Sequence, residues 1–465
     1  MIKYSVGIIG GGPGGYVAGI RLEQLGVKCV VFEKERLGGV CLNWGCIPTK
    51  ALVKVADQFQ EFQVAVQEGY LRGTAAIDFS EVKVRQKKIV EQLVGGIEYI
   101  YDKRKIALVI NTVEVIKATN AGYEITAGGE QYSVDYLIIA TGSKPKSLPF
   151  MPFDGERILS SRDLLSLEIL PQKLVVVGGG VIGCEFACIF RQLGVEMEIV
   201  EFLPSLIAME DEEVGKRLST SFKKMKIKLH TKTAVEGYEY LENGIRLLLS
   251  NGKTLEADKV LVSVGREPLF EIKCEGFELQ RERGFVTIDE EMRSNNSKIF
   301  AIGDVTGKLM LAHAASKQAV MAAETIYAEL NKVKSAAANL RYENIPRCTY
   351  TNPEIGSAGL TEAEAREKYG EIETGRFMFA ANGKALTQSQ TTGFVKVIAE
   401  KTGGRIVGMH IIGPSATELI GQGGILLGLE ADMGKVKKIV FAHPTLSEAI
   451  GEALEDLEGL ALHKI

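Results

Sequence analysis

Two cysteines in one short segment are the side chains best suited to redox chemistry. Cys41 and Cys46 lie in GGVCLNWGCIPTK, and Lys50 follows the second thiol closely. A disulfide needs Cα atoms about 4.4–6.8 Å apart, slightly closer than residues i and i+5 on a regular helix. We therefore expect a distorted turn, for which Gly45 and Pro48 provide the means. The alternative is a pair of thiols that only fill space, the commonest role of intracellular cysteine.

Thiol–disulfide exchange also needs a base, because the attacking species is a thiolate. The best candidate among the histidines is His443, in the segment FAHPTLSE before a final predicted helix. Glu448 is suited to orienting the imidazole and stabilising its charge. The same residues also fit a capping box, Thr445-x-x-Glu448, at the start of that helix. The two roles are compatible.

A glycine-rich turn after a short apolar strand predicts a first cofactor site. Residues 6–15 read VGIIGGGPGG and lead into a helix that ends near Gly26, and a second apolar strand ends at Glu33. In such a βαβ unit the glycines let the backbone approach a pyrophosphate, which lies on the helix N-terminus, while the acid binds a ribose hydroxyl.

The same fingerprint occurs a second time. VVVGGGVIG at residues 175–183 leads through QLGV to a strand that ends at Glu201. The alternative, glycine-rich turns of an ordinary α/β sheet, explains the matched repeat poorly, so we expect two dinucleotide sites. No Lys or Arg lies between Val195 and Ser205, and an acid holds the ribose position, so NAD is favoured over NADP at the second site.

Two dinucleotides on one chain indicate electron relay, and FAD with NAD is the economical pairing. Two further strand ends favour a flavin: ATGS at residues 140–143 follows one strand, and IFAIGD ends at Asp304. An aspartate at the carboxyl end of a strand can accept hydrogen bonds from a ribityl chain. Taken alone, Asp304 fits equally well as a cap before the helix predicted from His313 to Leu330.

The composition excludes other classes of protein. The length of 465 residues predicts two to four domains. The net charge of −4 lacks the excess of basic residues that is typical of nucleic-acid-binding proteins. Apolar runs are far shorter than the roughly 20 residues that span a bilayer. The chain enters a strand-like run within its first residues, leaving no room for a signal peptide. The seven cysteines fit a reducing compartment, so we expect a cytoplasmic protein without structural disulfides.

Six segments together carry a family resemblance: GGVCLNWGCIPTK, VVVGGGVIGCEFA, IFAIGDV, YTNPEIGSAGLTE, HIIGPSATELI and HPTLSE. On these, the chain resembles the dihydrolipoyl dehydrogenases, a branch of the class I pyridine nucleotide-disulfide oxidoreductases, over essentially its whole length. The Leu-Asn after Cys41 and the acidic Glu201 are similar to that branch rather than to glutathione reductase. No cysteine follows Cys348, unlike mercuric and large thioredoxin reductases. Phe441-Ala442 departs from the family's usual His-Ala before His443.

The resemblance implies an α/β fold with two Rossmann-like FAD/NAD(P)-binding domains and a C-terminal α+β dimerisation domain. The implied domains are an FAD-binding domain at 1–146, an NAD-binding domain at 147–270, a central domain at 271–342 that completes the FAD site, and a dimerisation domain at 343–465. In the implied homodimer, His443 and Glu448 serve the partner subunit's cysteines.

The resemblance also assigns site residues. The implied catalytic residues are Cys41, Cys46, His443, Glu448 and Lys50, with no metal. For FAD the matching positions are Gly10, Gly12, Gly15, Glu33, Gly39, Val40, Lys50, Thr141, Gly142, Asp304, Leu311 and Ala312. For NAD they are Gly178, Gly180, Gly183, Glu185, Glu201, Gly265 and Arg266.

The activity implied is reoxidation of protein-bound dihydrolipoamide, with electrons passing through a Cys41–Cys46 disulfide and FAD to NAD⁺. His443 would take a thiol proton, and the lipoyl thiolate would attack Cys41, leaving Cys46 as the thiolate against the flavin. The lipoyl group would belong to an acyltransferase of a 2-oxo acid dehydrogenase complex or to the H protein of a glycine-cleavage system.

Three other functions remain open from the residues alone. An NAD-linked reductase of another small disulfide, such as glutathione, would need arginines for the substrate's carboxylates. A non-catalytic flavoprotein subunit would have no use for Cys41, Cys46 and His443. An NADH oxidase that uses oxygen would not need them either.

Overall fold

The computed structural model describes residues 2–334 and 340–464, which form two compact units. Each unit is assembled from three separate stretches of the chain. Unit 1 comprises Met1–Leu52, Asp78–Lys146 and Gly265–Tyr342, and unit 2 comprises Val53–Ile77, Ser147–Val264 and Glu343–Ile465. The first fingerprint and the cysteine pair belong to unit 1, whereas the second fingerprint and His443 belong to unit 2.

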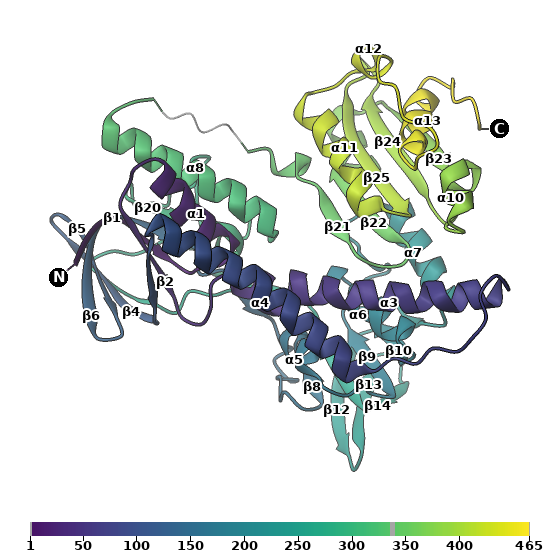
Figure 1. The fold of residues 1–465 in the computed structure, drawn as a ribbon, viewed down its shortest axis with the longest axis horizontal. Coiled ribbons are helices and arrows are strands. Elements are labelled where there is room, and N and C mark those ends of the chain that lie inside the picture. The colour runs from purple at the N-terminus through teal and green to yellow at the C-terminus, as the bar shows by residue number, and fades with distance from the viewer. Residues whose placement is uncertain (1, 335–339, 465) are drawn as a thin grey trace. The chain divides into compact units, whose positions relative to one another are not determined.

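Unit 1 is built on one mixed sheet (Figure 1). Its elements are β1 (Ile2–Ile9), α1 (Pro13–Gln24), β2 (Cys29–Glu33), α2 (Gly39–Trp44), the start of α3 (Cys46–Gln67), α4 (Phe79–Arg104), β3 (Ala107–Ile110), β4 (Val113–Thr119), β5 (Gly122–Ala127), β6 (Glu130–Ile139), β7 (Ser143–Pro145), β16 (Arg266–Pro268), β17 (Lys273–Glu275), β18 (Arg281–Glu282), β19 (Phe285–Val286), β20 (Ile299–Ala301), the 3-10 turn η1 (Gly303–Thr306) and α8 (Ala312–Asn331). The strand order is β17-β4-β5-β6-β1-β2-β3, and β20 also pairs with β6.

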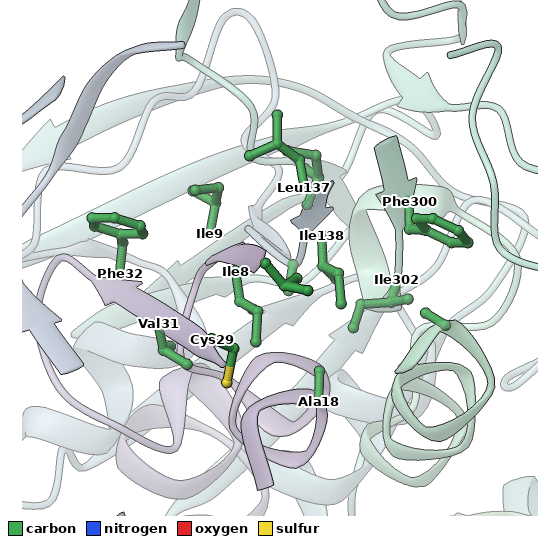
Figure 2. Close-up of a cluster of buried hydrophobic side chains, with 14 of the residues drawn as sticks. Ile8, Ile9, Ala18, Cys29, Val31, Phe32, Leu137, Ile138, Phe300 and Ile302 are labelled. Carbon is green, nitrogen blue, oxygen red and sulfur yellow. The ribbon is translucent and has the colours of Figure 1, made fainter. Parts of the chain in front are cut away.

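The core of unit 1 lies where the parallel strands β1, β2, β6 and β20 meet α1. Figure 2 shows the apolar side chains there, among them Ile8, Phe32, Ile138 and Phe300, each at most 1% exposed. Since these strands are buried on both faces, they read as continuous apolar runs rather than as alternating ones. The helix predicted from His313 is confirmed as α8, which packs beside α1.

Unit 2 contains a parallel sheet, a small antiparallel sheet and a C-terminal antiparallel sheet. The first two comprise β8 (Ile158–Leu159), α5 (Ser161–Ser166), β9 (Lys173–Val177), α6 (Val181–Gln192), β10 (Glu196–Val200), α7 (Glu212–Lys224), β11 (Lys228–His230), β12 (Val235–Leu241), β13 (Gly244–Leu249), β14 (Thr254–Ala257) and β15 (Lys259–Val262). The parallel order is β11-β10-β9-β15-β8.

The C-terminal part of unit 2 is an α+β layer. It comprises η2 (Tyr342–Asn344), which begins at the last residue of unit 1, β21 (Arg347–Thr349), β22 (Glu354–Gly359), α9 (Glu362–Tyr369), β23 (Ile372–Met378), η3 (Phe379–Ala381), α10 (Gly383–Thr387), β24 (Phe394–Glu400), β25 (Ile406–Gly413), α11 (Ala416–Gly428), α12 (Met433–Val436) and α13 (Glu448–Asp456). The strand order is β21-β22-β25-β24-β23, and α11 and α13 pack on this sheet (Figure 1).

The predicted α/β architecture is therefore confirmed: two fingerprint sheets and a C-terminal α+β region. In the part of the chain that the structure describes, no helix combines the length and the apolar character needed to cross a membrane.

Candidate active site and nucleotide sites

The cysteine pair sits at a break between two helices, as predicted. Helix α2 ends at Trp44, Gly45 leaves the helical conformation with φ −146° and ψ −111°, and α3 begins at Cys46. A Cβ on Gly45 would lie 2.9 Å from the carbonyl oxygen of Val40, closer than real Cβ atoms come. The break therefore depends on glycine, and it brings the two thiols together.

The thiols of Cys41 and Cys46 are hydrogen-bonded to each other. This bond, together with burial, raises the pKa of the Cys41 thiol, while the Lys50 ammonium acts in the opposite direction. Cys46 is exposed and Cys41 is half-buried. An exposed sulfur in contact with a second sulfur is the arrangement that thiol–disulfide exchange needs.

Two polar side chains hold this break; Asn43 was noted from the sequence only as part of the family resemblance, and Gln86 was not singled out. The amide of Asn43 donates to the carbonyl oxygens of Leu37 and Gly39, each at 3.0 Å. The buried amide of Gln86, on α4, donates to the carbonyl oxygen of Pro48 at 3.1 Å. The position of Asn43 between the two cysteines was the only signal available for either residue.

The turn of the first fingerprint is braced by Glu33. Its carboxylate accepts from the N–H of Gly11 at 2.7 Å and from the N–H of Glu35 at 2.8 Å. A Cβ on Gly15 would lie 1.7 Å from the carbonyl oxygen of Gly10, so the chain itself requires that glycine. Gly12 differs, because its φ is −69° and a Cβ there would meet only the Cα of Gly39, at 3.9 Å.

The features around this turn fit a bound flavin dinucleotide. Gly12 caps the N-terminus of α1 and leaves open the space that a pyrophosphate would use. Thr141 Oγ1 and Asn43 Oδ1 are buried without a hydrogen-bond partner among the described residues. Since orphaned buried polar atoms are rare, their presence indicates a ligand or water that completes them. The residues predicted to hold FAD therefore suit that group.

Asp304 lies in η1 and does not cap α8, so that alternative is wrong. The residue that caps α8 is Leu311, which makes no side-chain cap bond. The hydroxyl of Ser143 donates to Asp304, and Arg266 donates to that hydroxyl at 2.7 Å. Arg266, for which we expect a contact to the second nucleotide, belongs to unit 1 together with Asp304.

A buried amide fixes the backbone in front of Asp304. Gln318, which has no exposed surface, accepts from the N–H of Gly303 at 2.6 Å and donates to the hydroxyl of Tyr342 at 2.8 Å. Gly303 has a φ of +74°, a conformation that glycine tolerates best. Gln318 was not singled out from the sequence because nothing local distinguishes it from other polar residues of an amphipathic helix.

The second fingerprint repeats the geometry of the first. Glu201 accepts from the N–H of Gly179 at 2.5 Å and from the N–H of Leu203 at 2.6 Å. A Cβ on Gly183 would lie 2.0 Å from the carbonyl oxygen of Gly178, whereas a Cβ on Gly180 would meet nothing within 4 Å. The space before α6 is therefore open, and it fits a second dinucleotide phosphate.

A pocket adjoins this turn. It is lined by Gly179, Gly180, Val181, Glu201, Leu203, Ser205, Ile207, Ala208, Met209 and Glu210. Glu185, which we expected to bind NAD, is buried on α6 and accepts from the N–H of Tyr350 at 2.9 Å. That bond ties α6 to the C-terminal region of the same unit.

His443 and Glu448 form the predicted pair. His443 Nδ1 lies 2.9 Å from Glu448 Oε1, and Glu448 Oε2 accepts from the N–H of Thr445 at 2.8 Å. These two contacts lower the pKa of Glu448, the Thr445 N–H more than the imidazole. The Thr445 hydroxyl donates to the carbonyl of Ala442 and not to the helix, so the capping box is only half formed. The His443 side chain is 80% exposed, which leaves its second ring nitrogen, Nε2, accessible to a substrate.

Comparisons with known proteins agree with this description. The family model "Pyridine nucleotide-disulphide oxidoreductase" matches residues 4–319, and the model of that family's dimerisation domain matches residues 345–454. A dihydrolipoyl dehydrogenase of Bacillus subtilis is 38% identical, with 99% of this chain and 100% of the relative covered. One from Zymomonas mobilis is 36% identical, with 98% of each chain covered.

Solved structures share the fold. LpdA of Mycobacterium tuberculosis has a TM-score of 0.88 at 24% identity, covering 98% of this chain and 100% of that one. The flavoprotein disulfide reductase RclA of Escherichia coli has a TM-score of 0.83 at 23% identity, covering 97% and 99%.

Proposed function

The chain belongs to the pyridine nucleotide-disulphide oxidoreductase family, and from this membership we propose that it is a dihydrolipoyl dehydrogenase that uses FAD and NAD⁺. The observation that carries the proposal is the hydrogen-bonded Cys41–Cys46 pair at a glycine-dependent helix break, in the same unit as the first fingerprint. Relatives with this activity by name match the chain over its full length.

The proton transfer follows from the geometry of the histidine. Because Nδ1 of His443 bonds Glu448, Nε2 is the atom that receives the proton of the incoming dihydrolipoyl thiol. The carboxylate holds the ring and stabilises the imidazolium that forms. Glu448 is itself held by the Thr445 N–H, which keeps it ionised.

The thiol–disulfide exchange involves only the two thiols of the substrate and the Cys41–Cys46 disulfide. The substrate thiolate attacks Cys41 Sγ, a mixed disulfide forms, the Cys41–Cys46 bond breaks, and its electron pair stays on Cys46 as a thiolate. The second substrate thiol then attacks the substrate sulfur of the mixed disulfide, which closes the lipoyl ring. Cys41 is the leaving group, and it takes up the proton of that second thiol. The chemistry that a bound flavin supplies is two-electron transfer from the reduced sulfurs to NAD⁺.

The expected arrangement is a homodimer, in keeping with the matched dimerisation domain, with His443 and Glu448 serving the partner subunit's cysteines. We propose the same division into an FAD domain, an NAD domain, a central domain and a dimerisation domain at the boundaries given above. The lipoyl group would be carried by an acyltransferase or a glycine-cleavage H protein, in the cytoplasm.

The test compares two histidines that each pair with a glutamate. General-base catalysis is worth about 10²–10⁴-fold, so His443→Gln should slow dihydrolipoamide turnover by that order while NADH still reduces the flavin. His463→Gln is the control, since His463 pairs with Glu452 and is exposed. Near-normal turnover by His443→Gln, or faster turnover of glutathione than of dihydrolipoamide by the wild type, would overturn the proposal.

A further inference from the structure

The segment 202–211, which follows Glu201, forms much of the wall of the second pocket. Its contributions are Leu203, Ser205, Ile207, Ala208, Met209 and Glu210. In a dinucleotide fold the acid at the end of the second strand marks the adenosine ribose. A wall that continues from this acid therefore borders the adenosine half of the nucleotide.

This segment is docked on the fingerprint in a strained conformation. The N–H of Ile207 donates to the carbonyl of Gly179 at 2.8 Å, and the adjoining Leu206 is fully buried. Ile207 has a φ of +43°. A β-branched residue there is a true outlier that costs on the order of 1–3 kcal/mol, so the surrounding structure must hold it.

The holding groups come from the C-terminal sheet. Arg347, on β21, donates through Nε and a terminal nitrogen to the two carboxylate oxygens of Glu210, at 3.0 and 3.1 Å. The Glu210 side chain is only 5% exposed. At the next residue, Lys396 on β24 donates to both oxygens of Asp211 at 3.0 Å, and both side chains are at most 2% exposed.

The two anchors differ in what their loss would do. Lys396 contacts Asp211, Glu213 and Glu362, so removing it leaves the buried Asp211 carboxylate without its cation and endangers the fold. Arg347 pairs with Glu210, which is one of the residues that line the pocket. Without Arg347 the Glu210 carboxylate would be buried without a cation. It would turn toward water, and the backbone of segment 202–211 would move with it.

We propose that Arg347 is a positioning residue for nucleotide affinity: by clamping Glu210 it lets the dimerisation domain set the shape of the adenosine pocket. The inference rests on the proposed NAD function, because it assigns that nucleotide to the second fingerprint. Arg347 touches no reacting atom, so it should change the affinity for the nucleotide and not the chemistry of the sulfurs.

The test uses the flavin-loaded dimer and ADP-ribose, which contains the adenosine and both phosphates, measured by calorimetry. Arg347→Gln should raise the Kd of ADP-ribose at least fivefold. Arg347→Lys keeps the charge but loses the bidentate contact, so its Kd for ADP-ribose should lie between those of the wild type and Arg347→Gln. Arg405→Gln is the matched control, since Arg405 pairs with Glu400 on the same sheet, and it should bind as the wild type does.

Kinetics and a double variant separate positioning from general damage. Arg347→Gln should raise the KM for NAD⁺ while leaving kcat and the KM for dihydrolipoamide unchanged. If Arg347 acts through Glu210, the double variant Glu210→Gln/Arg347→Gln should bind no more weakly than the worse single variant. Additive losses would overturn the inference.

Two further outcomes are distinguishable. A wild type that does not bind ADP-ribose refutes the proposed nucleotide site itself, and with it the function. A wild type that binds, with Arg347→Gln binding equally well, refutes only the role of Arg347. If Arg347→Gln loses its flavin or no longer forms a dimer, the Kd of ADP-ribose is measured on Arg347→Lys instead. A Kd equal to that of the wild type in that folded variant would contradict the proposal.

Discussion

Alanine in place of Gly180 should weaken nucleotide binding strongly while leaving the fold intact. Gly180 is the N-cap of α6, with φ −74° and ψ −175°, a conformation open to any residue. A Cβ at this position meets no atom within 4 Å. Within residues 2–334 and 340–464 no contact therefore requires a glycine here, and the expected occupant of that space is the ligand.

The expected magnitudes follow from these two facts. At an N-cap, alanine is less favourable than glycine by up to about 1.7 kcal/mol, and the lower entropy of the unfolded chain offsets about 0.4–1 kcal/mol of this. The Tm should therefore move by no more than about 3 °C. A methyl group that keeps a phosphate off the helix N-terminus removes at least one charge-assisted hydrogen bond, about 1.5–3 kcal/mol. That loss corresponds to a Kd about 10- to 150-fold higher.

Gly183→Ala is the comparator, because its Cβ would lie 2.0 Å from the carbonyl oxygen of Gly178 and the turn would have to move. It should lose both affinity and stability, since overpacking of this kind costs about 1–3 kcal/mol. Calorimetric titration with ADP-ribose and thermal melts of both variants provide the measurement. Wild-type affinity in Gly180→Ala, or a fall in Tm equal to that of Gly183→Ala, would refute the reasoning.

Two more outcomes are expected. Gln318→Leu should release flavin more readily than the wild type, because the N–H of Gly303 loses its acceptor, while Gln318→Glu keeps an acceptor and should retain flavin; ultrafiltration and flavin absorbance measure this. The pKa of Glu198 is lowered from 4.5 to about 2, since bonds from Lys173 and His230 outweigh the opposing effect of burial. A carboxyl with a depressed pKa stabilises the fold above its unfolded pKa and loses that contribution as the pH falls toward the folded value. The difference in Tm between wild type and Glu198→Gln should therefore be full at pH 7 and shrink between about pH 4.5 and pH 2; a difference that stays constant over that range would contradict it.

Local requirements made the fingerprints readable from sequence. Gly15 and Gly183 are needed because a Cβ would strike a carbonyl oxygen of the same turn, so spacing alone predicts the geometry. The helix break at Gly45 is local in the same way. By contrast, the alternative role of Asp304 as a cap depended on where α8 begins. The N-cap of α8 is Leu311, and a hydrophobic residue at that position does not mark the start of a helix in the sequence.

Contacts between distant residues could not be predicted. Lys396 is the one cation in an otherwise apolar stretch of β24 and reads as an ordinary lysine, yet it is 1% exposed and bonds Asp211 from a position 185 residues away. Arg347 and Glu210 are 137 residues apart. Such pairs follow from how the segment before α7 packs on the C-terminal sheet, and charge patterning within either segment does not specify the partner.

The acids at the ribose positions have a role that the fingerprint alone does not reveal. Glu33 and Glu201 each use both carboxylate oxygens to hold two backbone N–H groups, one of them in the glycine turn itself. Each oxygen has a second lone pair, so a ribose hydroxyl can still be accepted without breaking these bonds. Replacing Glu201 with a cation that favours a 2′-phosphate would remove the acceptor from the N–H groups of Gly179 and Leu203. The preference for NAD and the shape of the turn thus depend on the same carboxylate, and changing one without the other would require a compensating acceptor elsewhere.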